Sequence, residues 1–312
     1  MNEHFFRAHG IMFHHFYDDR HIKGQGAISG DQLEQMINYY KIHYNLLRAD
    51  EWMNKAVSGY LQNADVCLTF DDTLLCQYEI AVPVLKKFNL TAFWFVYSSV
   101  IKGEIEMLEV YRKFRTVFYD KIDSFYNDFF KKTEISKYRD LIKESLRTFS
   151  AEKYLTSFPF YSAADKKFRF LRDDVLGVEN YRQMMSLLMT SYNIDVQSFS
   201  SDLWMKEYHI RQLFSDGHVI GLHSHSHPTR LVELPSYAQK REYELNYKII
   251  SEIIGESPVS MSHPCNSYNE ETLNVLEGLG IQLGFRANME KHTFSKFEFP
   301  REDHANIIGK LV

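Results

Sequence analysis

The sequence of 312 residues predicts an α/β fold in which short parallel strands alternate with helices. Short runs of apolar, β-branched and aromatic residues are separated by segments whose apolar residues recur at helical spacing. An aspartate pair and a group of histidines directly follow two of these short runs. Barrel enzymes assemble their active sites at the carboxyl ends of parallel strands, so this arrangement favours a barrel.

The first hundred residues provide a strand–helix–strand unit, which implies parallel pairing. An apolar segment over 10–13 runs into two histidines. A helix is predicted over 30–42, because Ser29 and Gln32 have the pattern of a capping box ahead of a helically spaced apolar stripe. The run over 66–70 is expected to be a buried strand. A helix and a further strand are expected over 77–88 and 91–96.

A long segment over 103–214 interrupts this alternation. It is rich in Tyr, Phe, Lys and Asp, and its pattern is mostly helical with loops. Because no linker rich in Gly, Pro or Ser brackets it, we expect a helical insertion within a single domain over 1–312. The alternation then resumes as strand, helix, strand, helix and strand, over 217–222, 236–254, 258–262, 270–279 and 281–286.

Composition excludes several classes of protein. The apolar fraction of 45% is ample for a large core, and the net charge of -5 gives no basic surface, so nucleic acid is not an expected partner. Three cysteines without short paired spacing argue against a disulfide framework. The N-terminus lacks the apolar core of a secretion signal, and no run approaches the about 18 apolar residues that span a bilayer. We therefore expect a cytoplasmic location and no transmembrane segment.

Two adjacent carboxylates, Asp71 and Asp72, end the apolar run over 66–70. Adjacent residues at a strand end point in different directions, so one can bind a metal ion while the other faces the substrate water. A metal ion on Asp72 would also keep Asp71 ionised, as a general base requires. A turn or a helix cap after the strand is the alternative interpretation of the pair.

Three histidines occupy alternate positions of residues 223–227, directly after a second apolar run. Imidazoles cost free energy to bury without partners, so core packing explains them poorly. An exposed polar loop and an adventitious metal tract are two further interpretations. The pattern favours metal ligation, either by His223 with His225 on one face of a continuing strand or by His223 with His227 in a turn. One aspartate and two histidines with open coordination positions suit the activation of water, which indicates a metal-dependent hydrolase.

Two further groups have ordinary explanations. His14 follows the apolar opening segment, and a structural histidine buried at a strand end is the favoured interpretation from the residues alone. The segment 263–268 contains proline and asparagine in a pattern typical of a turn. Cys265 within it has no adjacent acid–base partner, which argues against a nucleophilic role.

Together these segments resemble the polysaccharide deacetylase family, the NodB-homology carbohydrate esterases. The family has an Asp-Asp motif within Thr-Phe-Asp-Asp-Gly, which residues 69–72 match, although Thr73 replaces the usual glycine. Its His-Ser/Thr-x-x-His motif is matched in full by residues 223–227, and the resemblance settles the ligand pair in favour of His223 with His227.

The third motif of the family is matched more loosely. Residues 262–269 look like its Tyr-Pro-Tyr-Gly-Ser-Tyr-Asn variant, with Ser262 where the more usual version carries an arginine. The opening over 11–15 looks like the Tyr-His start of members in which an early histidine is the general acid. The resemblance covers residues 10–100 and 215–304 and says little about the segment between them.

This resemblance implies an irregular (β/α) barrel of about seven strands, here with a helical insertion. It also implies that Asp72, His223 and His227 hold a divalent metal, zinc in the first place, with nickel or cobalt as alternatives for similar ligands. Asp71 would be the general base, and Arg301 is the predicted substitute for the missing arginine. The other implied roles are an oxyanion-binding loop at Pro264 and Cys265 and a general acid at either His14 or His304.

The expected function is therefore metal-dependent hydrolysis of N-acetyl groups on an amino sugar or polysaccharide, in surface-polysaccharide metabolism. The expected partner is an N-acetylated sugar, oligosaccharide or sugar conjugate, and a cytoplasmic location would favour a nucleotide- or lipid-linked one. A hydrolase of another linear non-peptide amide or of a formyl group is one alternative. A second is an inactive carbohydrate-binding homologue, which Thr73 and the missing arginine motivate. For the insertion, packing or a dimer interface is preferred over an aromatic lid.

Overall fold

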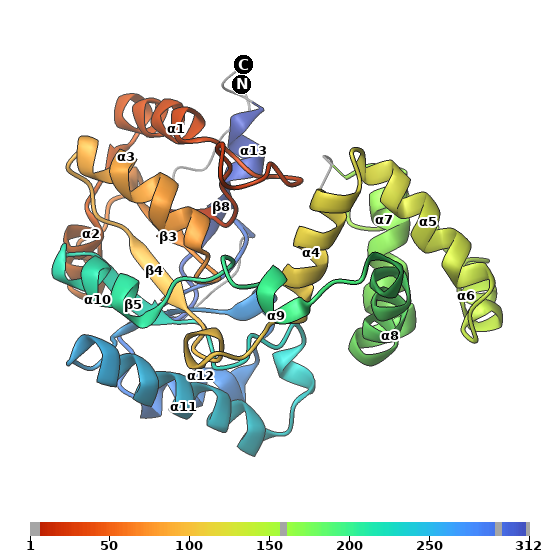
Figure 1. The fold of residues 1–312 in the computed structure, drawn as a ribbon. Helices are drawn as coiled ribbons and strands as arrows, with labels where there is room; N and C mark the ends of the chain where they lie inside the picture. The colour runs from red at the N-terminus through yellow and green to blue at the C-terminus, as the bar shows by residue number, and fades with distance from the viewer. Residues whose placement is uncertain (1–6, 157–160, 291–294, 310–312) are drawn as a thin grey trace. The chain divides into compact units, whose positions relative to one another are not determined.

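The computed structural model describes residues 7–156, 161–290 and 295–309. The chain divides into two compact units (Figure 1). The barrel unit comprises Met1–Ile105 and Asp202–Val312, and the helical unit comprises Glu106–Ser201. The helical unit thus falls within the segment predicted as an insertion, whereas the last helix of that segment belongs to the barrel unit.

The barrel unit is built on a parallel sheet in the order β7-β6-β5-β4-β3-β1-β8, with β2 paired to β3. A parallel bridge between Phe285 and Phe299 joins β7 to the chain that enters β8, so seven strands form a nearly closed barrel. The predicted α/β barrel is confirmed, and β8 is a strand that the sequence pattern did not indicate. The strands are β1 (His9–Phe13), β2 (Asn45–Leu46), β3 (Asp65–Phe70), β4 (Phe93–Val96), β5 (Val219–Leu222), β6 (Ser260–Ser262), β7 (Leu283–Phe285) and β8 (Arg301–Asp303).

Helices surround this sheet (Figure 1). The helix predicted over 30–42 is confirmed as α1, where Ser29 Oγ accepts the amide of Gln32 at 3.2 Å and the Ser29 amide donates to Gln32 Oε1 at 2.9 Å. The helix predicted over 77–88 begins as a π-helical turn over Gln77–Ala81. The helices of the barrel unit are α1 (Gly30–His43), α2 (Ala49–Val57), α3 (Val82–Lys87), α10 (Glu207–Ser215), α11 (Ser236–Ile254), α12 (Glu270–Gly278) and α13 (His304–Ile308).

Strand side chains alternate between the barrel interior and the helix layer, as the period of two requires. On β3, Val66 and Leu68 belong to the large core under the helices, whereas Cys67 belongs to a separate inner cluster. Phe95 on β4 and Phe285 on β7 have ring centroids 5.6 Å apart although their strands are not neighbours, so this inner cluster fills the barrel. The members of the inner cluster are Ala49, Trp52, Cys67, Phe93, Phe95, Leu283 and Phe285.

The helical unit has an aromatic core, formed by Phe125, Phe129 and Phe168 with their neighbours. Its mostly helical pattern is as predicted. No helix within the described residues is long and apolar enough to cross a membrane. The helices of this unit are α4 (Met107–Phe118), α5 (Ile122–Glu134), α6 (Arg139–Ser145), α7 (Ala163–Phe170), α8 (Gly177–Met189) and α9 (Val196–Phe199).

One buried histidine makes the stability of the barrel unit sensitive to acid. His218 is 4% exposed, and its Nδ1 atom accepts the amide of Ala92 at 3.0 Å, which requires an unprotonated nitrogen. Burial lowers the pKa of His218 to about 4. The unfolded chain takes up this proton near the ordinary pKa of 6.5, whereas the folded chain takes it up only near 4.

We therefore expect His218→Gln to flatten the decline in unfolding free energy between pH 6.5 and pH 4. The histidine contributes up to about 1.4 kcal/mol per pH unit in this window, because only the unfolded state gains its proton there. Urea unfolding at several pH values measures the slope. His43→Gln, at an exposed position of α1, is the control and should leave the slope unchanged. Equal slopes for wild type and His218→Gln would contradict the assignment.

Candidate metal centre and catalytic site

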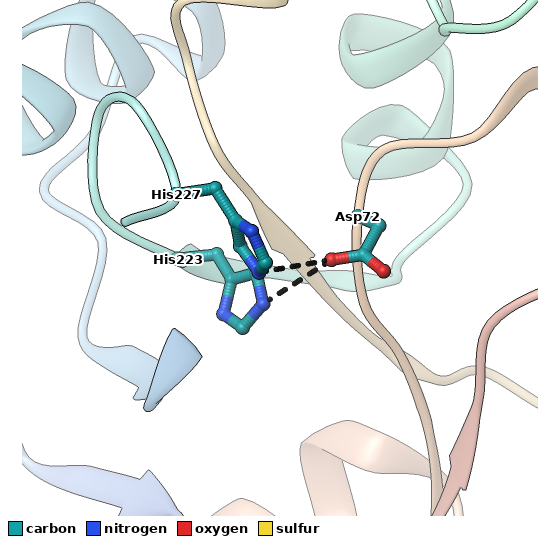
Figure 2. Close-up of side chains that lie close together, drawn as sticks. All are labelled: Asp72, His223 and His227. Carbon is teal, nitrogen blue, oxygen red and sulfur yellow. Dashed lines mark ion pairs between the residues drawn. The ribbon is translucent and has the colours of Figure 1, made fainter. Parts of the chain in front are cut away.

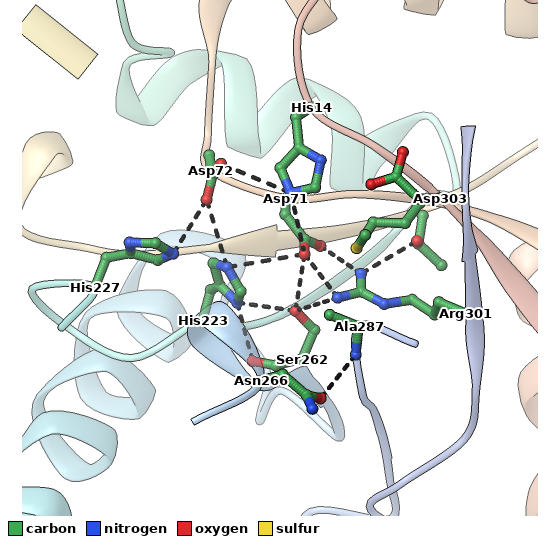
Figure 3. A network of polar contacts seen from close by, with 12 residues as sticks. His14, Asp71, Asp72, His223, His227, Ser262, Asn266, Ala287, Arg301 and Asp303 are labelled. Atoms are coloured by element: carbon green, nitrogen blue, oxygen red, sulfur yellow. Dashed lines mark hydrogen bonds and ion pairs between the residues drawn. The ribbon is translucent and has the colours of Figure 1, made fainter. Parts of the chain in front are cut away.

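The predicted site residues meet at the carboxyl ends of the barrel strands (Figure 3). Asp71 and Asp72 follow β3, His223 follows β5, and Ser262 ends β6. The alternation that turns Cys67 inward also turns Asp71 inward, four residues later on the same face. The site therefore caps the apolar interior of the barrel.

Asp72, His223 and His227 bring three potential ligand atoms together (Figure 2). These atoms lie within 4.8 Å of one another. Asp72 Oδ1 lies 3.3 Å from His227 Nε2 and 3.5 Å from His223 Nε2. In tetrahedral coordination, ligand atoms about 2.1 Å from a zinc ion are about 3.4 Å apart, so the spacing fits a metal ion. Asp72 Oδ1 is buried and has no hydrogen-bond partner among the described residues, as expected of an atom reserved for an ion.

The His223 ring is held in the orientation that ligation needs. Its Nδ1 atom lies 2.9 Å from the carbonyl oxygen of Ser262. Donation of the Nδ1 proton to that carbonyl leaves the Nε2 lone pair directed at Asp72. Burial lowers the pKa of His223, but Asp71 and Asp72 outweigh it and the pKa is raised. His225, the alternative ligand, instead places Nδ1 2.9 Å from Ser98 Oγ.

Asp71 is paired with an arginine inside the barrel. Arg301 Nη1 and Nη2 each donate to one carboxylate oxygen of Asp71 at 2.7 Å, and both side chains are almost fully buried. Arg301 Nε donates to the carbonyl of Arg286 at 2.9 Å, which fixes the guanidinium plane. Burial raises the pKa of Asp71, but Arg301 and then His223 outweigh it and the pKa is lowered. Asp71 is therefore ionised and held in one orientation.

Arg301 thus stands where the resemblance to the family implied a substitute. Its Cζ atom lies 5.7 Å from the ring centroid of Phe95, so the polar layer rests directly on the inner cluster. Ser262, which occupies the position of the usual arginine, donates from Oγ to Asp71 Oδ2 at 3.3 Å. Arg301 Nη2 also donates to Ser262 Oγ at 3.4 Å, so the serine and the guanidinium hold Asp71 together.

The two candidate general acids lie in different surroundings. His14 Nε2 lies 3.9 Å from an oxygen of Asp71 and 3.9 Å from an oxygen of Asp72, and its side chain is 28% exposed. His304 is buried against Phe13, with its two ring nitrogens 3.2 Å and 2.9 Å from the carbonyl oxygens of Met12 and Gly26. The arrangement brings His14, rather than His304, to the aspartate pair.

The loop after β6 carries the third motif. Residues Pro264–Asn266 form a short 3-10 turn in which Pro264 is buried and Cys265 is exposed. Cys265 and Asn266 have φ angles of 49° and 55°. Asn266 Oδ1 accepts the amide of Ala287 at 3.0 Å, which ties the loop to the chain after β7.

Left-handed backbone is concentrated at this site. Asp72 and His227, two of the potential ligands, have φ angles of 76° and 54°. Such angles are uncommon in residues other than glycine, and they gather at functional sites. Within the described parts of the chain, six of the nine residues of this kind lie in the three site loops, namely Asp72, Thr73, Ser224, His227, Cys265 and Asn266.

The backbone conformation of residue 73 is one that favours glycine, which the family usually carries at this position. The φ angle of Thr73 is 59°, a conformation that is strained for a β-branched residue. Its Oγ1 atom is also buried without a hydrogen-bond partner among the described residues. Its carbonyl oxygen accepts the amide of Met205 at 2.8 Å, and this contact would survive a change of side chain.

We expect Thr73→Gly to raise the free energy of unfolding by about 1 kcal/mol. Relief of left-handed strain and of an unsatisfied hydroxyl outweighs the added entropy of the unfolded chain and the lost methyl group. Thr73→Val removes the hydroxyl but keeps the branched side chain, so it should be less stable than Thr73→Gly. Chemical denaturation measures both variants. A less stable glycine variant would contradict this interpretation.

Two residues of α11 clamp the histidine loop, and sequence reasoning missed both. Asn246 Oδ1 accepts the amide of His223 at 3.0 Å. Glu242, one turn earlier, accepts the amides of His225 and Ser226 at 2.9 Å and 2.7 Å. Their spacing of four residues, on the face toward the loop, is the signal that could have indicated them.

Loss of this clamp should weaken metal binding. We expect Glu242→Ala to lower zinc affinity by about 10- to 100-fold, as for other residues that hold metal ligands in place. Glu242→Gln should recover part of the loss, because its carbonyl oxygen can still accept an amide. Glu244→Ala, at an exposed position of the same helix, is the control. A competitive chelator titration measures the affinities, and an unchanged affinity for Glu242→Ala would show that the loop needs no clamp.

Comparison with known proteins identifies the family that the chain resembles. Residues 164–284 match the profile of the family described as polysaccharide deacetylase, a range that contains the histidine motif but not the aspartate pair. No curated protein sequence matches the chain.

Several solved structures share the fold. Streptococcus pyogenes deacetylase PplD, in complex with acetate, matches with a TM-score of 0.54 and 13% identity over 95% of this chain and 92% of its own. A de-N-acetylase from Aggregatibacter actinomycetemcomitans matches with a TM-score of 0.53 and 14% identity over 95% and 93%. IcaB from Ammonifex degensii matches with a TM-score of 0.52 and 14% identity over 94% and 87%.

The fold is a (β/α) barrel with a candidate metal centre at the carboxyl ends of its strands. The resemblance to the polysaccharide deacetylase family, the NodB-homology carbohydrate esterases, is confirmed by the family profile together with these structures. At 13–14% identity the structures establish the fold, and the family supports the coarse class of a deacetylating hydrolase.

Proposed function

We propose that the chain is a metal-dependent hydrolase that removes N-acetyl groups from an amino sugar, alone or within a saccharide. The observation that carries this proposal is the ionised Asp71, locked by Arg301 beside the group formed by Asp72, His223 and His227. This combination supports the proposal, because a fixed carboxylate beside three potential metal ligands is what a metal-dependent hydrolase would need.

Asp72, His223 and His227 would hold a divalent ion, with zinc preferred and nickel or cobalt suited to the same ligands. When bound, such an ion supplies Lewis acidity, which polarises a carbonyl group and lowers the pKa of water. The buried Oδ1 atom of Asp72 and the two histidine Nε2 atoms support this role, because their spacing suits one ion.

The residues of the chain would carry the proton transfers. Asp71 accepts the proton of the attacking water as the new carbon–oxygen bond forms at the acetyl carbonyl. Arg301 keeps the carboxylate in place and ionised. His14, in its protonated form, donates to the nitrogen as the carbon–nitrogen bond breaks, so that acetate and a free amine leave. Pro264 and Cys265 stand in the loop that would face the developing oxyanion.

The substrate within this class is part of the proposal. We favour an amino sugar of a surface polysaccharide or its sugar-conjugate precursor, and a cytoplasmic location would point to a nucleotide- or lipid-linked form. Hydrolysis of another linear amide or of a formyl group would use the same residues. A binding protein without turnover is the other candidate.

Acetate release from N-acetylated oligosaccharides tests the proposal. Metal-stripped protein, with and without added zinc, would be assayed against chitin oligomers, nucleotide-linked N-acetylamino sugars and formylated analogues. Zinc-dependent acetate release supports a deacetylase. Release of formate alone would indicate a hydrolase of formyl groups or other amides. Zinc binding without release of either product would indicate a binding protein. Failure to bind zinc would remove the basis of the mechanism.

A further inference from the structure

Two buried or half-buried arginines of the helical unit have no ion pair among the described residues, and a third arginine lies close to them. Arg115 on α4 is 8% exposed, and the close contacts of its guanidinium within the described residues are with aromatic rings. Arg169 on α7 has a buried Nε atom without a hydrogen-bond partner in the same parts of the chain. Arg172, directly after α7, pairs with its neighbour Asp173, whose carboxylate is 40% exposed.

The three guanidinium groups lie against aromatic rings, and two of them share one ring. The Cζ atoms of Arg115 and Arg172 lie 5.7 Å and 5.9 Å from the ring centroid of Phe168. The Cζ atom of Arg169 lies 4.0 Å from the ring centroid of Tyr161. Burial is the main cause of the lowered pKa values of Arg115 and Arg169, and each is lowered further by neighbouring arginines.

Buried hydroxyl and carboxyl groups lie near these arginines. Tyr181 lies among the arginines, since Arg115 and Arg172 lower its pKa against the larger effect of burial. Asp165 on α7 is 4% exposed and accepts the hydroxyl of Tyr126 and the amide of Ser162, but the pKa values of Arg115 and Arg169 respond mainly to burial, tyrosines and other arginines.

Contact with aromatic rings stabilises Arg115 by less than its burial costs, so packing alone does not explain why a charged residue lies there. Contact with an aromatic face stabilises a desolvated cation by about 2 kcal/mol. Taking a charged side chain out of water costs several kcal/mol when no opposite charge accompanies it. Arg115 is therefore a net destabilising residue in the absence of a counter-charge, and its neighbours add like charge.

We propose that Arg115, Arg169 and Arg172 form a binding site for an oxyanion, a phosphate or carboxylate group carried by a small ligand. Guanidinium groups match both oxyanions through paired N–H donors, and the hydroxyl of Tyr181 adds a further donor. A phosphate group could come from a phosphorylated or nucleotide-linked sugar, and a carboxylate from an acidic sugar. The site lies wholly within the helical unit and is independent of the metal centre.

Thermal unfolding of the full chain in chloride buffer tests this site. Protein stripped of metal and dialysed free of chelator would be titrated with inorganic phosphate and with glucuronate, at constant ionic strength. We expect a saturable rise in melting temperature for at least one of them. Phosphate acting alone would assign a phosphorylated ligand, and glucuronate acting alone would assign an acidic sugar.

Arg115→Gln should raise at least 10-fold the anion concentration that gives half of the rise in melting temperature. Without an added anion, Arg115→Gln should melt at a higher temperature than wild type, because it removes an uncompensated charge. If Arg115 served only for packing, its replacement would lower the melting temperature instead. Arg147→Gln removes an exposed arginine of the same unit and should respond as wild type does. If Arg115→Gln does not fold, Arg169→Gln is the replacement variant, and it should also weaken the rise in melting temperature caused by the anion. No saturable rise with either anion, or an equal rise in the arginine variants, would overturn the proposal.

Discussion

Asp71→Asn is expected to reduce acetate release by about 100- to 10,000-fold, the range found when a general base is removed. Asparagine has nearly the shape of aspartate and can still accept one hydrogen bond from Arg301. It cannot accept a proton from water. The loss should appear in kcat, because Asp71 acts in the chemical step, while KM changes little.

Measurement of zinc affinity distinguishes a general base from a metal ligand at position 71. Asp71→Asn should bind zinc with nearly wild-type affinity, because the potential ligand atoms belong to Asp72, His223 and His227. Asp72→Asn should lose both zinc and activity. If Asp71→Asn keeps wild-type turnover, Asp71 is not the base. If it loses zinc as well as turnover, Asp71 acts as a ligand.

Arg301→Met is expected to be the most destabilising single change at the site. It leaves Asp71 buried and ionised without its cation, and removal of one partner from a buried pair costs about 3–5 kcal/mol. Arg301 is 0% and Asp71 3% exposed at the side chain, so water cannot screen the unpaired charge. Urea unfolding measures this loss, and activity should fall with it because Asp71 is no longer held.

The double variant Asp71→Asn with Arg301→Met separates charge from packing. Without the unpaired carboxylate, the double variant should be more stable than Arg301→Met alone, which is a strong departure from additivity. Arg301→Lys keeps the charge but cannot make two parallel hydrogen bonds, so its stability should lie between those of wild type and Arg301→Met. Additive losses would mean that Arg301 acts through packing rather than through its charge on Asp71.

The sequence was informative where local pattern and chemistry coincide. Asp71 and His223 each follow a short apolar run, and parallel strands bring such positions to one end of a barrel. The two histidines His223 and His227 also belong to one short motif, so their proximity was predictable. The region of the potential metal ligands therefore followed from neighbours in the sequence together with the fold class, whereas the choice of His227 over His225 came from the resemblance to the family.

Longer-range features were harder to predict. Arg301 could be suggested only through the resemblance to the family, because it is 230 residues from Asp71 in the sequence and β8 is three residues long, too short for a period of two to emerge. Glu242 on α11 reaches the histidine loop through backbone amides, so only its spacing of four residues from Asn246 could have indicated it. The left-handed backbone at Asp72 and Thr73 could not be predicted, since its usual signal is a glycine and neither residue is one.

The place of Arg301 on β8 links catalysis to the order of protein synthesis. Seven of the eight strands precede β8 in the chain, and β8 lies beside β1 at the seam where the barrel nearly closes. On the proposed mechanism, a ribosome-bound chain would have the potential metal ligands and Asp71 before it has the cation that neutralises and orients Asp71. The growing polypeptide would then stay inert toward sugars until β8 docks, and turnover would report that the seam has closed.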